Sequence, residues 1–225
     1  MRQDRAPTLT SFAAPRGGAQ RPSGSRAGAD PVVVYLHGFR SSSRSAKAQL
    51  FVRRVAALPA AARPRLYVPD LQVGPADAIS GVAAWIEREV RVPADELTLI
   101  GSSLGGYYAT HLAERCGARA VLINPAIRPY DDLRQYVGPQ VNLHSGEAFE
   151  VVEAHFAELL ALKVARITRP QRYFLLVRSG DEVLDWREAV AYYGGAAQYV
   201  LGGGDHGWVD FDDEVQSVLR FAGCA

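Results

Sequence analysis

A serine set between glycines is the feature of this sequence that most clearly suggests chemistry. Gly101, Ser103 and Gly105 form the pattern Gly-x-Ser-x-Gly, in which a serine hydroxyl can attack an acyl carbonyl. The pattern indicates such a nucleophile only where it joins a strand to a helix. Here an apolar run at residues 97–100 leads in, and a helical pattern over residues 104–115 leads out. The helix N-terminus would then direct free N–H groups at the reacting carbonyl, so Ser103 is predicted to be a nucleophile.

A serine hydroxyl needs a base, and His206 is the best candidate. It lies in a glycine-rich loop at residues 202–207, after the last predicted strand and C-terminal to both nucleophile and acid. This chain order is the one expected for a serine, an acid and a histidine on such a sheet. The other histidines lie in the loop after the first strand, in the middle of a helix, or in a long insertion: His37, His111, His144 and His155.

The acid that orients the base should follow the fifth strand, at residues 172–177. Asp181 is nearest to that strand end, and apolar residues follow it closely enough to anchor its loop. Asp185 is an alternative, although its position is more typical of a helix cap. Glu182 is a weaker candidate, and Asp205 is interpreted as a neighbour that shapes the loop of His206.

An oxyanion hole needs two backbone N–H donors. One is expected from Leu104, the residue after the nucleophile, and the other from the loop after the first strand. Phe39 lies in that loop, directly after His37 and Gly38, so its amide is the second candidate.

The elements that must position these residues alternate along the chain. Six short apolar runs predict strands at residues 31–36, 65–68, 97–100, 119–123, 172–177 and 198–201. Helical patterns lie between and after them. The first is expected to be capped by Ser42 or Ser43, and the others cover residues 77–90, 104–115, 185–193 and 214–221. Such alternation predicts an α/β fold with a mostly parallel sheet of about six strands, flanked by helices on both faces.

Residues 128–170 interrupt this alternation and hold no predicted strand. Their second half, residues 147–162, has helical periodicity with Phe149 and Phe156 among the aligned apolar positions. An insertion at the carboxyl end of the strands would cover the site that those ends build, so we expect a small helical lid. Phe149 and Phe156 are candidates for an acyl pocket in it.

Length and composition favour one globular domain over residues 31–225. The chain has 225 residues, of which 48% are hydrophobic and 22% charged. Residues 1–30 carry five Arg and two Asp and lack hydrophobic periodicity, which predicts a disordered extension. The remaining 20 basic and 22 acidic residues argue against nucleic-acid binding, and no apolar run approaches the roughly 18 residues of a membrane span. Two cysteines outside any metal-ligand spacing suggest a reduced, cytoplasmic protein without a metal site.

The motifs together resemble the α/β-hydrolases and, more narrowly, the bacterial esterase YqiA family. The resemblance covers about residues 32–222 and rests on residues 35–39 with 42–48, 101–110, 124–129, 180–185 and 203–207. It implies a cytoplasmic serine esterase that accepts short acyl esters and acyl-CoA thioesters without a cofactor, with Ser103, Asp181 and His206 as its triad. Arg40 and Trp208 depart from the pattern of such relatives, which bears on substrate preference.

The sequence therefore predicts a serine esterase or thioesterase acting on a small acyl ester or acyl-CoA. A peptidase or a lactonase could use the same triad, and a non-catalytic binding protein could keep the same fold. Arg40, Arg44 and Lys47 form a basic cluster that could dock the phosphates of a CoA-like leaving group. A solvated helix face is the simpler interpretation of that cluster.

Overall fold

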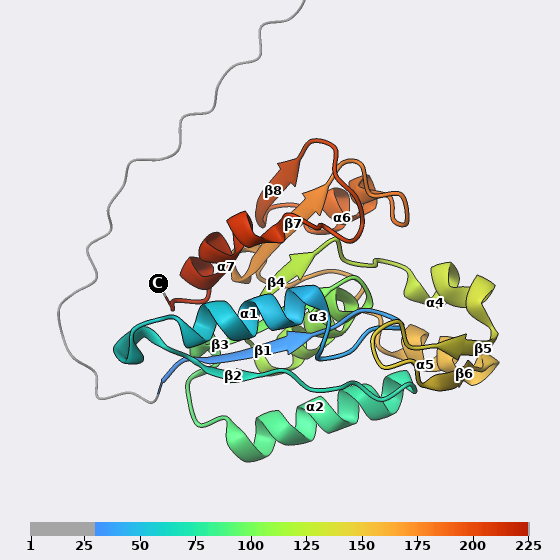
Figure 1. Cartoon of the computed structure of the whole chain (residues 1–225), viewed down its shortest axis with the longest axis horizontal. Coiled ribbons are helices and arrows are strands. Elements are labelled where there is room, and N and C mark those ends of the chain that lie inside the picture. Colours follow the sequence, from blue (N-terminus) through green and yellow to red (C-terminus); the bar gives the residue numbers. More distant parts are fainter. Residues whose placement is uncertain (1–29, 225) are drawn as a thin grey trace, which may run out of the picture.

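The computed structural model describes residues 30–224, and a fully parallel six-stranded sheet forms its centre (Figure 1). The strand order is β2-β1-β3-β4-β7-β8. This confirms the predicted α/β class, with each of the six apolar runs forming a strand. The strands are β1 (Val32–Leu36), β2 (Arg65–Tyr67), β3 (Leu97–Ser102), β4 (Arg119–Ile123), β7 (Tyr173–Arg178) and β8 (Ala197–Leu201).

Helices cover both faces of this sheet. One face packs against α1 (Ala46–Ala56) and α7 (Val215–Phe221), and the other against α2 (Pro75–Glu89), α3 (Leu104–Cys116) and α6 (Trp186–Tyr192). The first helix begins later than predicted, because the hydroxyl of Ser45 caps it by accepting from the amide of Ala48. Short 3₁₀ turns lie at Ala60–Ala62 (η1), Ala94–Glu96 (η2), Leu133–Tyr136 (η3), Pro170–Arg172 (η4) and Phe211–Glu214 (η5).

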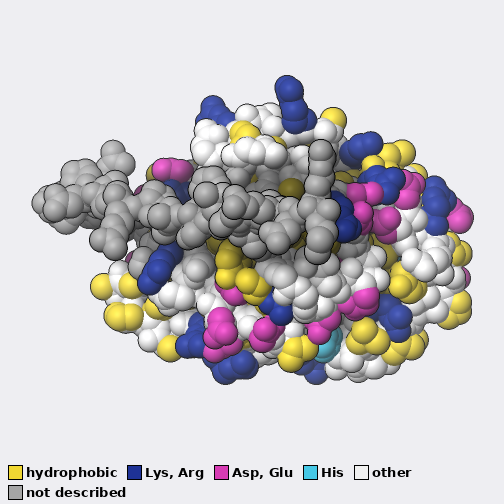
Figure 2. Space-filling model, turned by 90° about the horizontal axis from the view of Figure 1, so that it is seen from above, with side chains coloured by type: hydrophobic (Ala, Val, Ile, Leu, Met, Phe, Trp, Pro, Cys, Tyr) yellow, Lys and Arg dark blue, Asp and Glu magenta, His cyan; other side chains and the backbone are white. Residues whose placement is uncertain are grey.

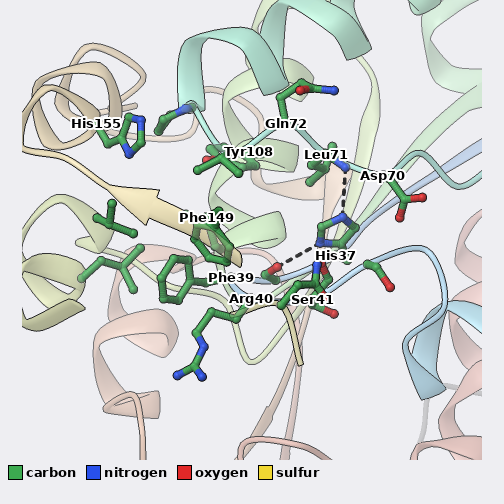
Figure 3. Close-up of a pocket in the computed structure, with 18 of the residues that line it drawn as sticks. His37, Phe39, Arg40, Ser41, Asp70, Leu71, Gln72, Tyr108, Phe149 and His155 are labelled. Atoms are coloured by element: carbon green, nitrogen blue, oxygen red, sulfur yellow. Dashed lines mark hydrogen bonds between the residues drawn. The ribbon is translucent and has the colours of Figure 1, made fainter. Parts of the chain in front are cut away.

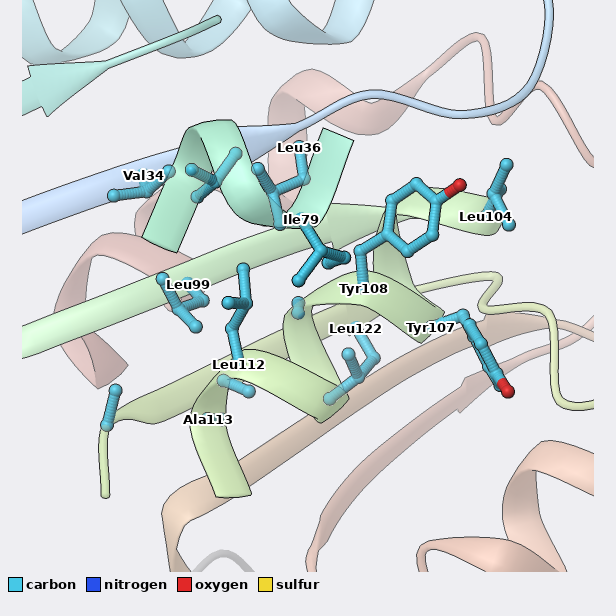
Figure 4. Packing of buried hydrophobic residues seen from close by; sticks show 14 of the residues in the cluster. Val34, Leu36, Ile79, Leu99, Leu104, Tyr107, Tyr108, Leu112, Ala113 and Leu122 are labelled. Carbon is cyan, nitrogen blue, oxygen red and sulfur yellow. The ribbon is translucent and has the colours of Figure 1, made fainter. Parts of the chain in front are cut away.

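Strand β1 shows how the sheet divides the core into two layers. Successive strand side chains point to opposite faces, and Val34 and Leu36 pack toward α2 and α3, whereas Val33 and Tyr35 pack toward α1 and α7. All five residues of β1 are buried, which explains its uninterrupted apolar sequence. Figure 4 shows the first layer, where Val34, Leu36, Leu99 and Leu122 of the strands meet residues of α2 and α3, labelled Ile79, Tyr108, Leu112 and Ala113.

The insertion between β4 and β7 differs from its predicted form. It contains a two-stranded antiparallel hairpin, β5 (Gly138–Val141) and β6 (Ala148–Val151), besides the helices α4 (Pro129–Asp132) and α5 (Glu153–Ala161). The helix predicted from residue 147 therefore begins only at Glu153. Residues 148–151 alternate between outward and inward positions, the two-residue period of a strand, and Phe149 points inward from β6.

The insertion lies beyond the carboxyl ends of the central strands, as the lid prediction requires (Figure 1). Its helix α5 contacts both α4 and α2, and its hairpin reaches the loop after β1. The hydroxyl of Tyr107 on α3 donates to the carbonyl of Leu159 at 2.8 Å, which ties α5 to the body.

The predicted extension at residues 1–30 lies, apart from Asp30, outside the described residues. On the face seen in Figure 2, basic and acidic side chains are interspersed and do not gather by sign. No helix between residues 30 and 224 combines the length and apolar character needed to cross a bilayer.

Candidate active site

Ser103 lies at the sharp junction between β3 and α3. Its backbone adopts φ 55° and ψ −122°, a conformation that residues other than glycine rarely adopt. The two flanking glycines make the turn possible. A Cβ at Gly101 would lie 2.2 Å from the carbonyl oxygen of Gly105, and a Cβ at Gly105 would lie 2.1 Å from that of Leu36. The predicted strand-turn-helix context of the serine is therefore present.

A chain of two hydrogen bonds joins the three predicted residues Ser103, His206 and Asp181. His206 Nε2 lies 3.0 Å from Ser103 Oγ, and His206 Nδ1 lies 2.8 Å from Asp181 Oδ2. Ser103, His206 and Asp181 follow strands β3, β8 and β7, respectively. Because these strands are parallel, their carboxyl ends lie at the same end of the sheet. This geometry allows the imidazole to take a proton from the serine while the carboxylate orients the ring.

The carboxylate of Asp181 is almost enclosed, with 1% of its side chain exposed. Its second oxygen accepts from the backbone N–H groups of Val183 at 2.9 Å and Leu184 at 2.8 Å. Burial raises the pKa of Asp181, but the hydrogen bond and charge of His206 and these two amides together lower it below its ordinary value. The anionic form is thereby held at neutral pH.

The other acids considered have different contacts. Asp185 caps α6 by accepting from the amide of Arg187, as its position in the sequence suggested. Glu182 accepts from the amide of His206 at 3.0 Å, and Asp205 accepts from the amide of Trp208 within the same loop. These acids therefore shape the loops beside the imidazole, and Asp181 alone of them bonds to its ring.

The loop after β1 passes directly over the serine. A Cβ at Gly38 would lie 3.1 Å from Ser103 Cβ and 3.7 Å from its Oγ, so only glycine fits without displacement there. Phe39 follows this close approach, and Leu104 is the first residue of α3, where the amide has no acceptor within the helix. The two predicted oxyanion donors therefore belong to the segments that border Ser103, and their role stays a prediction.

His37 holds this loop in place. Its Nε2 accepts from the amide of Leu71 at 3.0 Å, and its Nδ1 lies 2.9 Å from the carbonyl oxygen of Gly38. Burial lowers the pKa of His37, which favours the neutral ring that can accept this bond. The other three histidines form no hydrogen bond with Ser103 Oγ. His111 bonds to Leu162 of the insertion, and His144 and His155 belong to the insertion itself.

Sequence reasoning did not identify Asn124 as part of the site. It follows β4 in a left-handed conformation, φ 41°, and is 2% exposed. Its Oδ1 accepts from the amide of Arg178 at 2.9 Å, and its Nδ2 donates to the carbonyl of His206 at 3.1 Å. The side chain thus links the end of β7 to the histidine loop. A polar residue that directly follows a buried strand was the available signal.

Two cavities meet at the loop after β1. The first has a volume of about 310 Å³ and lies under the insertion (Figure 3). The second, of about 900 Å³, contains Ser103 and His206. Both share residues 38–41 as a common wall. The apolar lining of the first cavity includes Leu104, Tyr108, Phe149, Val151, Phe156 and Leu159.

The predicted pocket residues occupy different parts of these cavities. Phe149 and Phe156 both line the first, and the ring of Phe149 meets that of Phe39 edge-on at 6.0 Å (Figure 3). Arg40 borders both cavities. Trp208 reaches the wall of the second, but it is 1% exposed and packs mainly against Phe211 and beneath Arg178.

The tip of the hairpin is bound to the loop that follows Phe39. The amide of Leu143 donates to the carbonyl of Arg40 at 2.8 Å, and Asn142 Nδ2 donates to that of Ser41 at 2.7 Å. In return, Arg40 Nε donates to the carbonyl of Val141 at 3.1 Å. The hairpin and the candidate oxyanion loop therefore form one hydrogen-bonded unit.

The basic cluster of Arg40, Arg44 and Lys47 is divided between the two cavities, and only Arg40 borders both. Arg44 borders the first cavity, and Lys47 borders the second, where its ammonium donates to the carbonyl of Gly207. No group of three or more His, Cys, Asp or Glu side chains in residues 30–224 is arranged to hold a metal ion.

The parallel sheet, the strained strand-to-helix turn at a serine and the acid and histidine loops at neighbouring strand ends define an α/β-hydrolase fold. Residues 32–223 match the model of the Uncharacterised protein family UPF0227, and the chain belongs to this family, that of the YqiA esterases. The resemblance seen in the sequence motifs is thereby confirmed.

Solved structures of other proteins share the fold. A provisionally named hydrolase from Agrobacterium vitis S4 is 20% identical with a TM-score of 0.67, covering 86% of this chain and 88% of that one. The esterase domain of a Rhodothermus marinus protein is 17% identical with a TM-score of 0.62, covering 88% and 87%. A monoacylglycerol lipase from Paleococcus ferrophilus is 14% identical with a TM-score of 0.62, covering 88% and 97%.

Proposed function

We propose that this protein is a serine hydrolase that cleaves carboxylic ester or acyl thioester bonds through an acyl-enzyme. The observation that carries the proposal is the hydrogen-bonded chain Ser103–His206–Asp181 beside two candidate oxyanion donors. The names of the esterase and lipase with the same fold agree with this reaction class. As the family resemblance implies, we expect the reaction to need no cofactor and the enzyme to act in the cytoplasm.

The reaction follows from the geometry. His206 Nε2 takes the proton of Ser103 Oγ as the oxygen bonds to the acyl carbon, and the carbonyl oxygen becomes an oxyanion. The amides of Phe39 and Leu104 donate to that oxygen, and each such donor is typically worth about 100- to 1,000-fold in rate. Collapse of the intermediate breaks the bond to the alcohol or thiol, which leaves with the proton from Nε2.

Water completes the cycle. His206 Nε2 takes one proton from a water molecule, whose oxygen attacks the acyl carbon of the acyl-enzyme. The second tetrahedral intermediate collapses with cleavage of the bond to Ser103 Oγ, which regains the proton from Nε2. The carboxylic acid is released, while Asp181 keeps the imidazole in one tautomer and stabilises its positive charge throughout.

The first cavity is proposed to receive the acyl chain. It begins at Phe39 and Leu104, the donors that would hold the carbonyl oxygen, and continues along apolar side chains of the lid. A chain entering it would bury its methylenes, each contributing about 0.8 kcal/mol. The open second cavity, next to Ser103 and His206, would then hold the alcohol or thiol, with Arg40 between the two.

Mass spectrometry of the intact protein after exposure to a fluorophosphonate tests the serine. One adduct is expected on the wild type and none on Ser103→Ala, because only an activated serine reacts. A panel of esters and acyl-CoA compounds should then show hydrolysis by the wild type, with loss of most activity in Ser103→Ala. A well-folded wild type that neither reacts nor hydrolyses any of them would favour a binding protein instead.

Phe149→Trp tests the acyl pocket. The larger ring should raise KM for longer acyl esters more than for acetyl esters, because it fills part of the first cavity. Val141→Ala is the matched control, since Val141 lies on the other strand of the hairpin, is 45% exposed and does not line that cavity. An unchanged chain-length profile in Phe149→Trp would place the acyl chain elsewhere.

A further inference from the structure

A lysine of helix α1, Lys47, is hydrogen-bonded to the loop that carries His206. Lys47 lies in the first turn of α1, and its Nζ donates to the carbonyl oxygen of Gly207, the residue that follows His206. The contact joins positions 160 residues apart. Lys47 also lines the second cavity together with Ser103 and His206, so its ammonium lies within the proposed site.

The ammonium of Lys47 is partly closed to water and lies near two carboxylates. Burial lowers the pKa of Lys47 to about 8, while the nearby carboxylates of Asp205 and Asp181 act in the opposite direction. The charged and titratable groups on the walls of the same cavity are Tyr35 of β1, Arg40 after β1, Arg53 and Arg54 of α1 itself, His144 of the hairpin, His206 after β8, and Asp212 of η5.

The orientation of Lys47 excludes the two interpretations that its sequence position offered. A phosphate dock would leave the ammonium free for a ligand, but its Nζ donates to the carbonyl of Gly207, and Arg44 borders only the other cavity. A solvated helix face would leave the ammonium in water. Instead it bonds to a backbone carbonyl next to the imidazole.

The histidine loop needs such a contact, because its own sequence supplies little to hold it. Four of the six residues at 202–207 are glycine, and two of them, Gly203 and Gly204, have positive φ. Asn124 binds the carbonyl of His206, and Glu182 accepts from its amide. Lys47 adds a bond on the C-terminal side, at the next carbonyl along the chain.

We propose that Lys47 is a positioning residue that fixes His206 opposite Ser103 by holding the carbonyl of Gly207. The inference rests on the proposed hydrolase function and adds to it a specific support for the base. Misplacing a reacting group by about 1 Å can cost on the order of 100-fold in rate. We therefore expect Lys47 to act on the chemical step and to have little effect on substrate binding.

Lys47→Met tests the proposal, with Lys163→Met as the matched control. Lys163 is the other lysine of the sequence, is exposed, and has its ammonium over the ring of Tyr130 in the insertion. In Lys47→Met, kcat for an activated ester and the rate of phosphonylation of Ser103 should both fall about 10- to 100-fold. KM should change less than twofold, and Lys163→Met should match the wild type in each measurement.

The pH profile distinguishes positioning from a general loss of structure. If the charge of Lys47 holds the loop, the activity of the wild type should decline as pH rises past about 8, where the pKa of Lys47 lies. Lys47→Arg should restore most of kcat and move this decline to higher pH, since a guanidinium keeps its charge there. This variant also decides the question if Lys47→Met fails to fold.

Two results would overturn the inference. One is equal kcat and equal phosphonylation rates in folded Lys47→Met and Lys163→Met. The other is an alkaline decline that Lys47→Arg leaves unmoved. A wild type that does not react with the fluorophosphonate at all would instead contradict the proposed function, so the two failures are distinguishable.

Discussion

The side chain of Asn124 donates from Nδ2 to the backbone carbonyl of His206 at 3.1 Å, while its Oδ1 accepts from the amide of Arg178 at 2.9 Å. One buried amide therefore sets the spacing between the strand that leads to Asp181 and the loop that carries His206. The predicted acid and base are thereby linked through the end of β4.

Asn124→Gly should lower both activity and stability. Glycine accepts the φ of 41° without strain, so the substitution removes only the side chain and its hydrogen bonds. Leaving the buried amide of Arg178 without its acceptor should cost about 1–3 kcal/mol. Urea unfolding and kcat for an activated ester measure the two effects, and wild-type values for both would show that the loops are fixed by other contacts.

Ser103→Gly should be more stable than Ser103→Ala, although both should be inactive. The backbone at this position is strained for any residue with a Cβ, and such strain costs on the order of 1–3 kcal/mol. Glycine relieves it, and alanine does not. Thermal unfolding of the two variants side by side checks the difference. Equal stability would mean that the turn at φ 55° stores no strain.

Asp181→Asn should reduce kcat by about 10,000-fold, because the amide favours the wrong tautomer of the imidazole. Asp185→Asn is the matched control. Asparagine still caps α6, and this side chain bonds to Arg187 instead of the ring of His206. Kinetics of both variants at pH 7.5 separate the two acids, and the opposite ranking would assign the orienting role to Asp185.

The depressed pKa of Asp181 predicts a specific dependence of stability on pH. A carboxylate whose pKa is lower in the folded than in the unfolded chain stabilises the fold fully above its ordinary pKa. That contribution is lost as the pH falls through the folded value. The difference in unfolding free energy between the wild type and Asp181→Asn should therefore be larger at pH 7 than at pH 3. Urea denaturation at the two pH values measures it, and a constant gap would contradict the shift.

Much of the fold could be predicted because burial marks the sequence directly. Val33 and Leu36 point to opposite faces of the sheet and both are buried, so their strand is continuously apolar. The strand-turn-helix around Ser103 requires glycines at fixed positions, and the steric contacts of Gly101 and Gly105 explain why they can be recognised. The helix cap at Asp185 is predictable for a similarly local reason, because its side chain accepts from an amide only two residues away.

The parts that could not be predicted depend on contacts between distant residues. The hairpin strands β5 and β6 have only four residues each, too few for a clear strand pattern. Phe149 also fits the helical period of residues 153–161, so the sequence predicts a helix where β6 lies. Lys47 and Asn124 carry no local signal of their partners, because these lie 160 and 82 positions away. Trp208 directly follows the glycine-rich loop of His206, a sequence typical of an exposed segment, yet its indole is buried in the core.

Under the proposed function, the hydrogen bonds between the hairpin tip and residues 40–41 would connect substrate selection to turnover. Any substitution that shifts the hairpin to admit a different acyl chain also pulls on the segment that follows Phe39. Changes in preference at this lid should therefore alter the rate of acyl transfer together with affinity. In a lineage of such enzymes, new specificities would be reached most readily by exchanging side chains that face the first cavity, with the hairpin backbone left in place.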